Sequence, residues 1–325
     1  MVFYGNGIGD AIINRPALSA LGKLLPGPVR LICNSGRGEF LWRGLPFDET
    51  VTLSMEPDEL GIRAFDLSLI PRRYDGCEVF ATMVPWFSPS LDALVARLSP
   101  SRSYGMGAGF DVTLPLDYGK NSVELGFDVV RAAAGQHDIA GYRLPLAFDS
   151  QCERRVDRLL RGLFDLGYQH LISVHTETLE TKQWSHACIE EVLCRVLERS
   201  EDLMAVMVDY RPPERMCACH EHRIIRLPGL MLENAMRIVT LSDLFFGIDS
   251  CMLHAADHAG VPGVVLFGPE TEAYEFGYYW TSADHLKFVH RDDRAPIVLA
   301  IDAISRRLDA LGEGVASARV AERIG

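Results

Sequence analysis

Short apolar segments alternate with amphipathic stretches along the second half of the chain, and this pattern constrains the fold more than any other feature. The expected strands are residues 170–175, 204–208, 224–227, 244–247 and 264–267. The expected helices between and around them are residues 185–198, 232–241 and 252–259. Short apolar strands that alternate with helices are typical of a parallel sheet with both faces covered. The pattern therefore predicts a doubly wound α/β domain.

The first half begins with the same alternation. A β-prone run at residues 2–4 precedes a helical pattern over residues 11–25 and a second strand over residues 29–33. Strand, helix and strand in this order predict a βαβ unit and hence a second parallel sheet. The middle is less regular. The expected elements there are a strand at residues 66–70 and helices near residues 40–42, 91–98 and 122–134.

The alternation fades between residues 141 and 150, where an extended segment with Pro145 precedes a long amphipathic helix from about Glu153. We place the domain boundary in this segment. The predicted organisation is an α/β chain of two Rossmann-like doubly wound domains, residues 1–147 and 148–300, that face a cleft. Residues 301–325 are expected to form a C-terminal helix and tail that pack back on the first domain.

Charge and composition exclude several classes. A net charge of -12 over 325 residues argues against nucleic acid, because such binding needs clustered Lys and Arg. The charge also weakens docking on anionic lipid, although a local basic patch can override the average, so peripheral membrane contact stays open. No apolar run reaches the roughly 18 residues that span a bilayer. The start of the chain lacks a signal-peptide pattern, and the eight scattered cysteines do not resemble a disulfide framework, so we expect a cytoplasmic protein.

Three segments stand where ligands of α/β sheets bind, between a strand and the following helix. The first is Gly5-Asn6-Gly7-Ile8-Gly9-Asp10. Its glycines permit a sharp turn close to a ligand, but it matches neither a P-loop nor the dinucleotide fingerprint. From the residues alone Asp10 is either a helix cap, which is favoured, or a carboxylate directed at a ligand.

The second segment, residues 175–185, holds Lys182 close to a helix start, where the helix dipole disfavours a cation. Lys182 therefore either serves an anion or is an ordinary surface lysine, and the segment supports both equally. The third segment is residues 246–269, in which Asp249 and Ser250 open a helix and His254 follows one turn later. A cap and a core histidine explain these residues singly, but their conjunction with Gly268-Pro269 favours a binding site.

Together these segments resemble the heptosyltransferases, glycosyltransferase family 9. That family has a Gly-x-Gly-Asp turn after its first strand, a mid-chain Lys-x-Trp loop, and a Gly-x-Asp-Ser/Thr-x-x-x-His run ahead of Gly-Val-Pro and Phe-Gly-Pro. The matching segments here are residues 7–10, 182–184, 247–254, 260–262 and 267–269. They occur in the family's order and span nearly the whole chain.

The resemblance implies the GT-B architecture, with acceptor on the first domain and donor nucleotide on the second. It implies inverting transfer of a heptose or related sugar from an ADP-sugar co-substrate to a glycan or small-molecule hydroxyl, with no metal and no further cofactor. Asp10 matches the general base, Lys182 the diphosphate ligand and Asp249 the carboxylate at the sugar hydroxyls. The remaining expected donor-side residues are Thr178, Ser250, Cys251, His254, Gly268 and Pro269. The expected acceptor-side residues are Asn6, Gly7, Gly9 and Arg15.

The sequence departs from the family at Cys251, where Gly is frequent, and arginines in the first half are mixed with acids, so the acceptor stays open. Two alternatives also stay open: a nucleotide-sugar binding protein with impaired catalysis, and a nucleotide-sugar epimerase of the same architecture. The cluster Cys217, Cys219, His220 and His222 is interpreted as a reduced surface turn in preference to a metal site. The aromatic residues of segment 274–280 either stack on a ligand or pack on the sheet edge.

Overall fold

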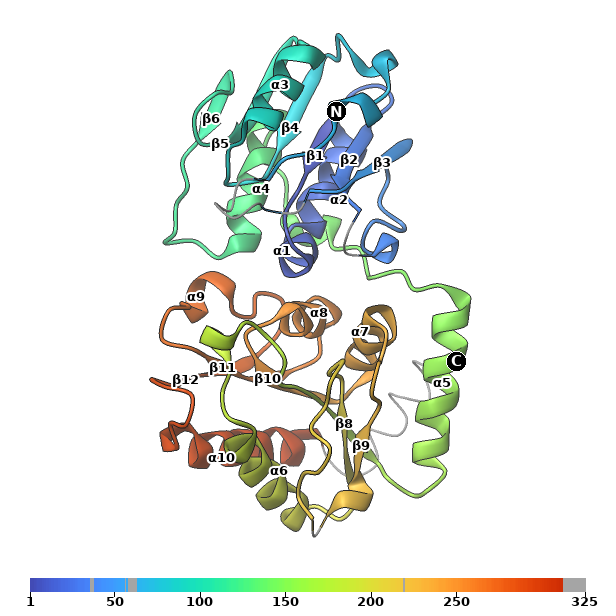
Figure 1. Cartoon of the computed structure of the whole chain (residues 1–325), viewed down its shortest axis with the longest axis vertical. Coiled ribbons are helices and arrows are strands. Elements are labelled where there is room, and N and C mark those ends of the chain that lie inside the picture. The colour runs from blue at the N-terminus through green and yellow to red at the C-terminus, as the bar shows by residue number, and fades with distance from the viewer. Residues whose placement is uncertain (36–37, 56, 58–62, 219, 312–325) are drawn as a thin grey trace. The chain divides into compact units, whose positions relative to one another are not determined.

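The computed structural model describes residues 1–35, 38–55, 57, 63–218 and 220–311. The chain divides into two compact units, Met1–Ala147 and Phe148–Gly325. Each contains one sheet of six parallel strands with helices packed on it (Figure 1). None of the helices in the described ranges is long and apolar enough to cross a membrane.

The first unit has the strand order β3-β2-β1-β4-β5-β6. Its strands are β1 (Val2–Tyr4), β2 (Arg30–Asn34), β3 (Glu49–Leu53), β4 (Val79–Thr82), β5 (Arg102–Met106) and β6 (Val112–Leu114). Its α-helices are α1 (Ile8–Ile13), α2 (Arg15–Leu24), α3 (Pro89–Leu98) and α4 (Ser122–Ala134). The order reverses between β1 and β4, and ligands of such sheets bind at the carboxyl end of this switch point.

The second unit repeats the plan with the order β12-β11-β10-β7-β8-β9. Its strands are β7 (His170–His175), β8 (Leu203–Met207), β9 (Ile224–Arg226), β10 (Leu244–Ile248), β11 (Gly263–Phe267) and β12 (Ala283–Lys287). Its α-helices are α5 (Ser150–Phe164), α6 (His186–Arg199), α7 (Leu232–Leu241), α8 (Cys251–Ala259), α9 (Ala273–Phe276) and α10 (Ala295–Leu311). The switch point here lies between β7 and β10.

The register of β10 on β7 explains one glycine. Gly247 lies opposite His175, and a Cβ at Gly247 would stand 2.7 Å from the His175 carbonyl oxygen. The close approach of the strands thus requires Gly247, and it brings together the loops that follow β7 and β10.

The helix predicted over residues 11–25 is divided into α1 and α2, and two further predicted elements differ in type from the structure. Residues 66–70 form no strand: Leu67–Leu69 is a 3₁₀ turn that Asp66 caps by accepting a hydrogen bond from the Ser68 amide at 2.8 Å. The short helix near residue 40 is likewise a 3₁₀ turn, Glu39–Leu41. In both segments a local polar or tight-turn geometry overrides the apolar pattern.

The predicted third segment, residues 301–325, is corrected by the structure. Helix α10 begins at Ala295, and its apolar face, with Ile297, Ile301 and Ile304, belongs to the core of the second unit. Arg307 fixes the helix further through Asp284 on β12, at 2.6 Å. The described part of the segment is therefore a helix of the second unit, because its buried face completes that core, and residues 312–325 lie outside the described ranges.

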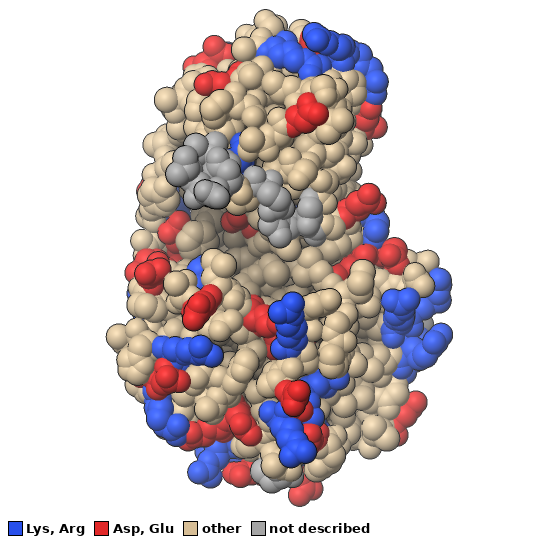
Figure 2. Space-filling model, viewed as in Figure 1, with Lys and Arg blue, Asp and Glu red and all other residues tan. Residues whose placement is uncertain are grey.

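Charged side chains of opposite sign are interspersed on the surface of the second unit (Figure 2). Many of them form ion pairs, such as Lys287 with Glu272 at 3.0 Å and Arg294 with Glu191. Basic charge is balanced by neighbouring acids at these pairs, whereas basic side chains gather over α5 (Figure 2), on which Arg154, Arg155, Arg158 and Arg161 are exposed.

Arg15 has a structural position that its sequence context did not indicate. Its side chain is 1% exposed, and its guanidinium donates to the carbonyl oxygens of Leu144 (3.0 Å), Leu41 (2.6 Å), Arg43 (2.8 Å) and Pro145 (2.9 Å). Burial lowers the pKa of Arg15 to about 10, which leaves it charged at neutral pH. Arg15 thus joins two segments of the first unit, and the expectation that it faces an acceptor is corrected.

Arg15→Met is expected to lower the free energy of unfolding by about 3 kcal/mol, because several buried carbonyl groups lose their donor. Chemical denaturation of the full chain measures this loss. Arg72→Met is the matched control, since the Arg72 side chain is 87% exposed. Equal stability of the two variants would contradict the structural role of Arg15.

Candidate active site

The loops after β7 and β10 bring three predicted residues into contact. Lys182 Nζ lies 2.6 Å from Asp249 Oδ2, and the Thr178 hydroxyl donates to the backbone oxygen of Asp249 at 3.1 Å. Gln183 supports the loop by donating to the Thr178 carbonyl at 3.1 Å. Neighbouring parallel strands end at the same edge of a sheet, which explains why residues 67 positions apart meet here.

The N-terminus of α8 lies directly beside this ion pair. Ser250 is its N-cap, yet its side chain caps no amide, and its buried Oγ has no hydrogen-bond partner among the described residues. The first-turn amides of a helix carry partial positive charge and attract anions. The ammonium group, the hydroxyl and the helix N-terminus together form a place suited to a diphosphate.

His254 and Cys251 on α8 are uncharged at neutral pH. Loss of hydration lowers the pKa of His254 to about 4, with Asp249 opposing this shift and Lys182 adding to it. Loss of hydration likewise raises the pKa of Cys251 to about 11. Cys251 therefore adds no negative charge where an anion would bind, and His254 offers a neutral imidazole.

The loop after β11 completes this edge of the sheet. A Cβ at Gly268 would lie 3.3 Å from the Thr181 oxygen and 3.6 Å from Lys182 Cα. A side chain at this position would therefore contact the lysine loop tightly at the Thr181 carbonyl. The adjacent Pro269 is exposed. Six of the predicted donor-side residues thus lie on three converging loops, and the other two, Cys251 and His254, lie in the first turns of α8. The six are Thr178, Lys182, Asp249, Ser250, Gly268 and Pro269.

Asp209 is a residue of this edge that the sequence analysis did not single out. It is fully buried and accepts hydrogen bonds from the Thr176 amide (2.7 Å), the Thr176 hydroxyl (2.8 Å) and the Glu177 amide (3.1 Å). His175 Nδ1 lies 2.8 Å from the same carboxylate. Asp209 therefore fixes the start of the loop that carries Thr178 and Lys182, and an aspartate just after an apolar strand is the signal that sequence offered.

Asp209→Asn is expected to lower the free energy of unfolding by about 2 kcal/mol at pH 7, because hydrogen bonds to a buried carboxylate are lost. Burial raises the pKa of Asp209, but the His175 contact and the Thr176 hydrogen bonds outweigh it and lower the pKa below 3.8. The stabilisation is thus full above about pH 4 and is lost as pH falls through the folded-state pKa. Denaturation curves at pH 7 and pH 3 measure it, with exposed Asp302→Asn as control. A stability gap between wild type and Asp209→Asn that does not shrink at pH 3 would refute this account.

The glycine turn of the first unit lies at the carboxyl end of β1. Gly7 is the N-cap of α1, and its amide donates to Asp10 Oδ2 at 3.3 Å. Asp10 is half-buried, as are Gly7 and Gly9. The Asp10 side chain therefore caps the helix while it stays partly accessible to solvent. Its capping role is compatible with a contact to a bound ligand.

Trp86, in the loop after β4, covers this turn. Its indole NH donates to Asn6 Oδ1, and a Cβ at Gly5 would stand 2.6 Å from its ring. The Arg63 guanidinium lies 5.9 Å from the centre of the Trp86 ring. Trp86 and Arg63 were not singled out from sequence, because their relation to residues 5–10 depends on the β1–β4 pairing.

The two weaker sequence signals are resolved differently. The Cys/His cluster does not come together as one group. Cys217 lies close to Glu190 and Cys194 of α6, whereas His220 accepts from Arg223 at 3.0 Å. His222 is exposed, and Cys219 lies outside the described residues.

In the aromatic segment, Asp257 accepts hydrogen bonds from the Tyr279 and Trp280 amides at 2.9 and 2.8 Å, and Trp280 packs edge-on against His258. This part of the segment packs on the second unit.

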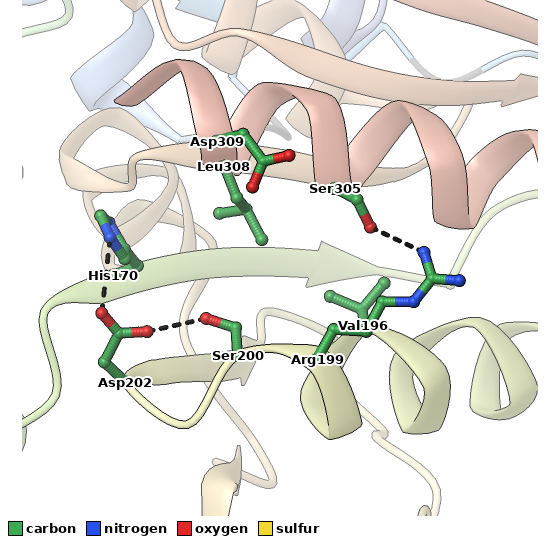
Figure 3. A pocket seen from close by; sticks show the side chains of 8 residues that line it. All are labelled: His170, Val196, Arg199, Ser200, Asp202, Ser305, Leu308 and Asp309. Atoms are coloured by element: carbon green, nitrogen blue, oxygen red, sulfur yellow. Dashed lines mark hydrogen bonds and ion pairs between the residues drawn. The ribbon is translucent and has the colours of Figure 1, made fainter. Parts of the chain in front are cut away.

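A cavity of about 530 Å³ opens at the opposite, amino-terminal edge of the second sheet (Figure 3). Most of its polar residues contact one another: His170 lies 3.7 Å from Asp202, and Arg199 donates to Ser305 at 3.2 Å. It lies at the wrong end of the strands to involve Lys182 or Asp249. We therefore place the candidate active site at the carboxyl edge.

Two Rossmann-like units in tandem, each a parallel six-stranded sheet with helices, define the GT-B fold class. No protein-family model and no curated protein sequence matches the chain. Among solved structures, a family 9 glycosyltransferase from Veillonella parvula DSM 2008 is similar with a TM-score of 0.71 and 15% identity over 99% of this chain and 97% of that one. E. coli heptosyltransferase WaaC with ADP gives 0.63 and 14% over 95% and 99%. A UDP-N-acetylglucosamine 2-epimerase described as putative, from Listeria monocytogenes, gives 0.56 and 15% over 100% and 92%.

Proposed function

We propose that this chain is an inverting glycosyltransferase that moves a heptose or related sugar from an ADP-sugar to a hydroxyl of a glycan or small natural product. The observation that carries the proposal is the 2.6 Å contact between Lys182 and Asp249 beside the N-terminus of α8. A lysine, a carboxylate and a helix N-terminus are the groups that hold a sugar diphosphate: cationic donors for the phosphates and an acceptor for the sugar hydroxyls.

On the donor side, the bond between the anomeric carbon and the diphosphate oxygen breaks, and negative charge grows on the departing ADP. Lys182 and the first amides of α8 stabilise that charge in this proposal, so no divalent ion is required. Lys182 exchanges its contact with Asp249 for the phosphate, and Asp249 becomes an acceptor for a sugar hydroxyl. Ser250 supplies a further hydroxyl, whose Oγ is buried without a partner among the described residues.

On the acceptor side, the attacking hydroxyl forms the new bond to the anomeric carbon and must lose its proton. Asp10 is the proposed general base, because its carboxylate is half-buried at the carboxyl end of β1. Asn6, Gly7 and Gly9 shape the turn around it. Trp86 and Arg63 add a flat apolar surface and a cation beside this turn, both suited to a sugar.

The nucleotide is proposed from the sequence resemblance and from the structural neighbours. E. coli WaaC has been solved with ADP and with ADP-2-deoxy-2-fluoro heptose. Those ligands belong to WaaC, and an adenine diphosphate donor for this chain is a proposal that the shared fold supports.

Thermal-shift titrations with ADP, UDP, GDP, CDP and ADP-heptose test the donor. A ligand that binds the folded state at a hundredfold excess over its dissociation constant stabilises it by about 2.7 kcal/mol. We expect a shift with ADP, a larger one with ADP-heptose, and release of ADP once an acceptor is supplied. Failure of every nucleotide to shift the transition would refute the proposal.

The epimerase alternative has one observation in its favour, the fold shared with the Listeria monocytogenes structure. It predicts a shift with UDP in place of ADP and interconversion of a UDP-sugar without any acceptor. A protein with impaired catalysis would instead bind ADP-heptose and release no ADP with any acceptor tested. The titration and the ADP-release assay therefore separate the three functions.

A further inference from the structure

Three metal-ligating side chains meet in the second unit, away from the residues proposed for transfer. Glu190 and Cys194 are one turn apart on α6, and Cys217 comes from the connection between β8 and β9. One carboxylate oxygen and the two sulfur atoms all lie within 4.8 Å of one another. This is the one such group of three or more His, Cys, Asp or Glu side chains within the described residues.

The backbone at Cys217 is held in an uncommon conformation. Its φ is 52°, a left-handed value that residues other than glycine rarely adopt. The Cys217 amide donates to the Glu190 carboxylate at 2.5 Å, and its thiol donates to the Glu190 carbonyl at 3.2 Å. Strained conformations of this kind persist where the surroundings fix them and cluster at functional sites.

Exposure is graded across the group in a way that suits an ion. Cys217 is 1% exposed, whereas Glu190 and Cys194 are half-buried. Cys217 thus lies on the core side, and the other two residues are partly accessible to solvent. All three side chains belong to compact elements of one unit.

Two thiolates and one carboxylate form a donor set that suits Zn²⁺. With zinc–sulfur bonds of about 2.3 Å, the edge of a tetrahedron is about 3.8 Å. The separations, all within 4.8 Å, exceed this edge by at most about 1 Å. Binding would release two thiol protons and leave the fourth position to water or another donor.

We propose that Glu190, Cys194 and Cys217 form a zinc site that fastens the β8–β9 connection to α6. The connection begins next to Asp209, which holds the loop of Thr178, and α6 begins just after Lys182. A zinc ion here would stabilise the elements next to the loop of Thr178 and Lys182. The inference rests on these three residues and stands whether or not the chain transfers sugar.

The first test is metal binding by the full chain, purified under reducing conditions and freed of metal by chelation. Zinc titration followed by elemental analysis is expected to give one tightly held ion per chain and a higher melting temperature. Co²⁺ is expected to give a thiolate-to-metal charge-transfer band, which carboxylates alone do not produce. An absence of this band, or zinc retained at no more than trace stoichiometry, would overturn the proposal.

Substitutions then assign the ligands. Cys194→Ser and Glu190→Gln are each expected to weaken zinc binding at least about tenfold, and Cys194→Ser to reduce the cobalt band. Cys77→Ser is the matched control, since Cys77 is also half-buried but lies in the first unit. Unchanged zinc affinity in folded Cys194→Ser and Glu190→Gln would refute the assignment.

Labelling of the wild-type chain keeps the proposal testable if the variants do not fold. Zinc is expected to protect Cys194 from iodoacetamide at least about tenfold relative to Cys77, because coordinated thiolates are not free nucleophiles. Equal labelling of the two cysteines with and without zinc, or a Cys194–Cys217 disulfide that persists under reducing conditions, would contradict the site.

Discussion

Asp10→Asn is expected to lower the rate of sugar transfer by about 10²- to 10⁴-fold, the usual contribution of a general base. Asparagine keeps the shape of the side chain, and its amide oxygen can still accept the hydrogen bond that Gly7 donates to Asp10 at 3.3 Å. It cannot take a proton from an acceptor hydroxyl. The loss should therefore appear in kcat, while the melting temperature and the ADP-dependent thermal shift stay close to those of wild type.

Asp92→Asn provides the control for this substitution. Asp92 also lies in the first turn of a helix of the first unit, α3, and it is exposed. Normal transfer is expected from this variant. Wild-type kcat in Asp10→Asn would remove the proposed base and would leave Asp10 with its capping role alone.

The sequence pattern predicts most of the fold because buried residues recur at the regular spacing of a helix or a strand. The all-apolar strands, such as Val264 to Phe267, are buried throughout, and strands of this kind occur in parallel sheets. The meeting of Lys182 with Asp249 is also predictable in outline, since both follow strands of one parallel sheet. The pattern does not predict the order of the strands in the sheet. It therefore does not predict which loops become neighbours.

The residues that sequence reasoning missed or misplaced depend on that order or on isolated contacts. Trp86 reaches the Gly5 turn only because β4 pairs with β1. Arg15 resembles a surface cation in sequence, and only its four carbonyl partners reveal it as buried. Residues 301–311 carry an apolar face whose packing partner is not visible in the sequence. In the structure this face packs in the core of the second unit.

The cysteine cluster shows the same limit. Sequence spacing groups Cys217 with Cys219, His220 and His222, whereas the fold pairs it with Glu190 and Cys194. Those partners are more than 20 residues away and on a helix. Metal-ligand proximity in this chain therefore follows from tertiary packing and is not visible in local spacing.

Lys182→Ala is expected to lower kcat/KM by about 10²- to 10³-fold, the effect of removing one donor that stabilises developing negative charge. The variant should also lose part of its ADP-dependent thermal shift, because the same ammonium group contacts the ground-state diphosphate. Lys287→Ala is the control: Lys287 is exposed and forms an ion pair with Glu272 at 3.0 Å. Normal activity in Lys182→Ala would exclude the proposed donor site.

A double-mutant cycle with Asp249 separates the catalytic from the structural part of this effect. Lys182→Ala leaves the Asp249 carboxylate, 5% exposed, without its partner, while the Lys182 side chain is 32% exposed and partly screened by water. The stability loss should thus be about 1–2 kcal/mol. Adding Asp249→Ala removes the unpaired charge and should recover much of that stability, but transfer should fall further, because the proposed contact with the sugar is lost as well. Recovery of activity together with stability would mean that the pair is structural, and the diphosphate would then have to be held by other groups.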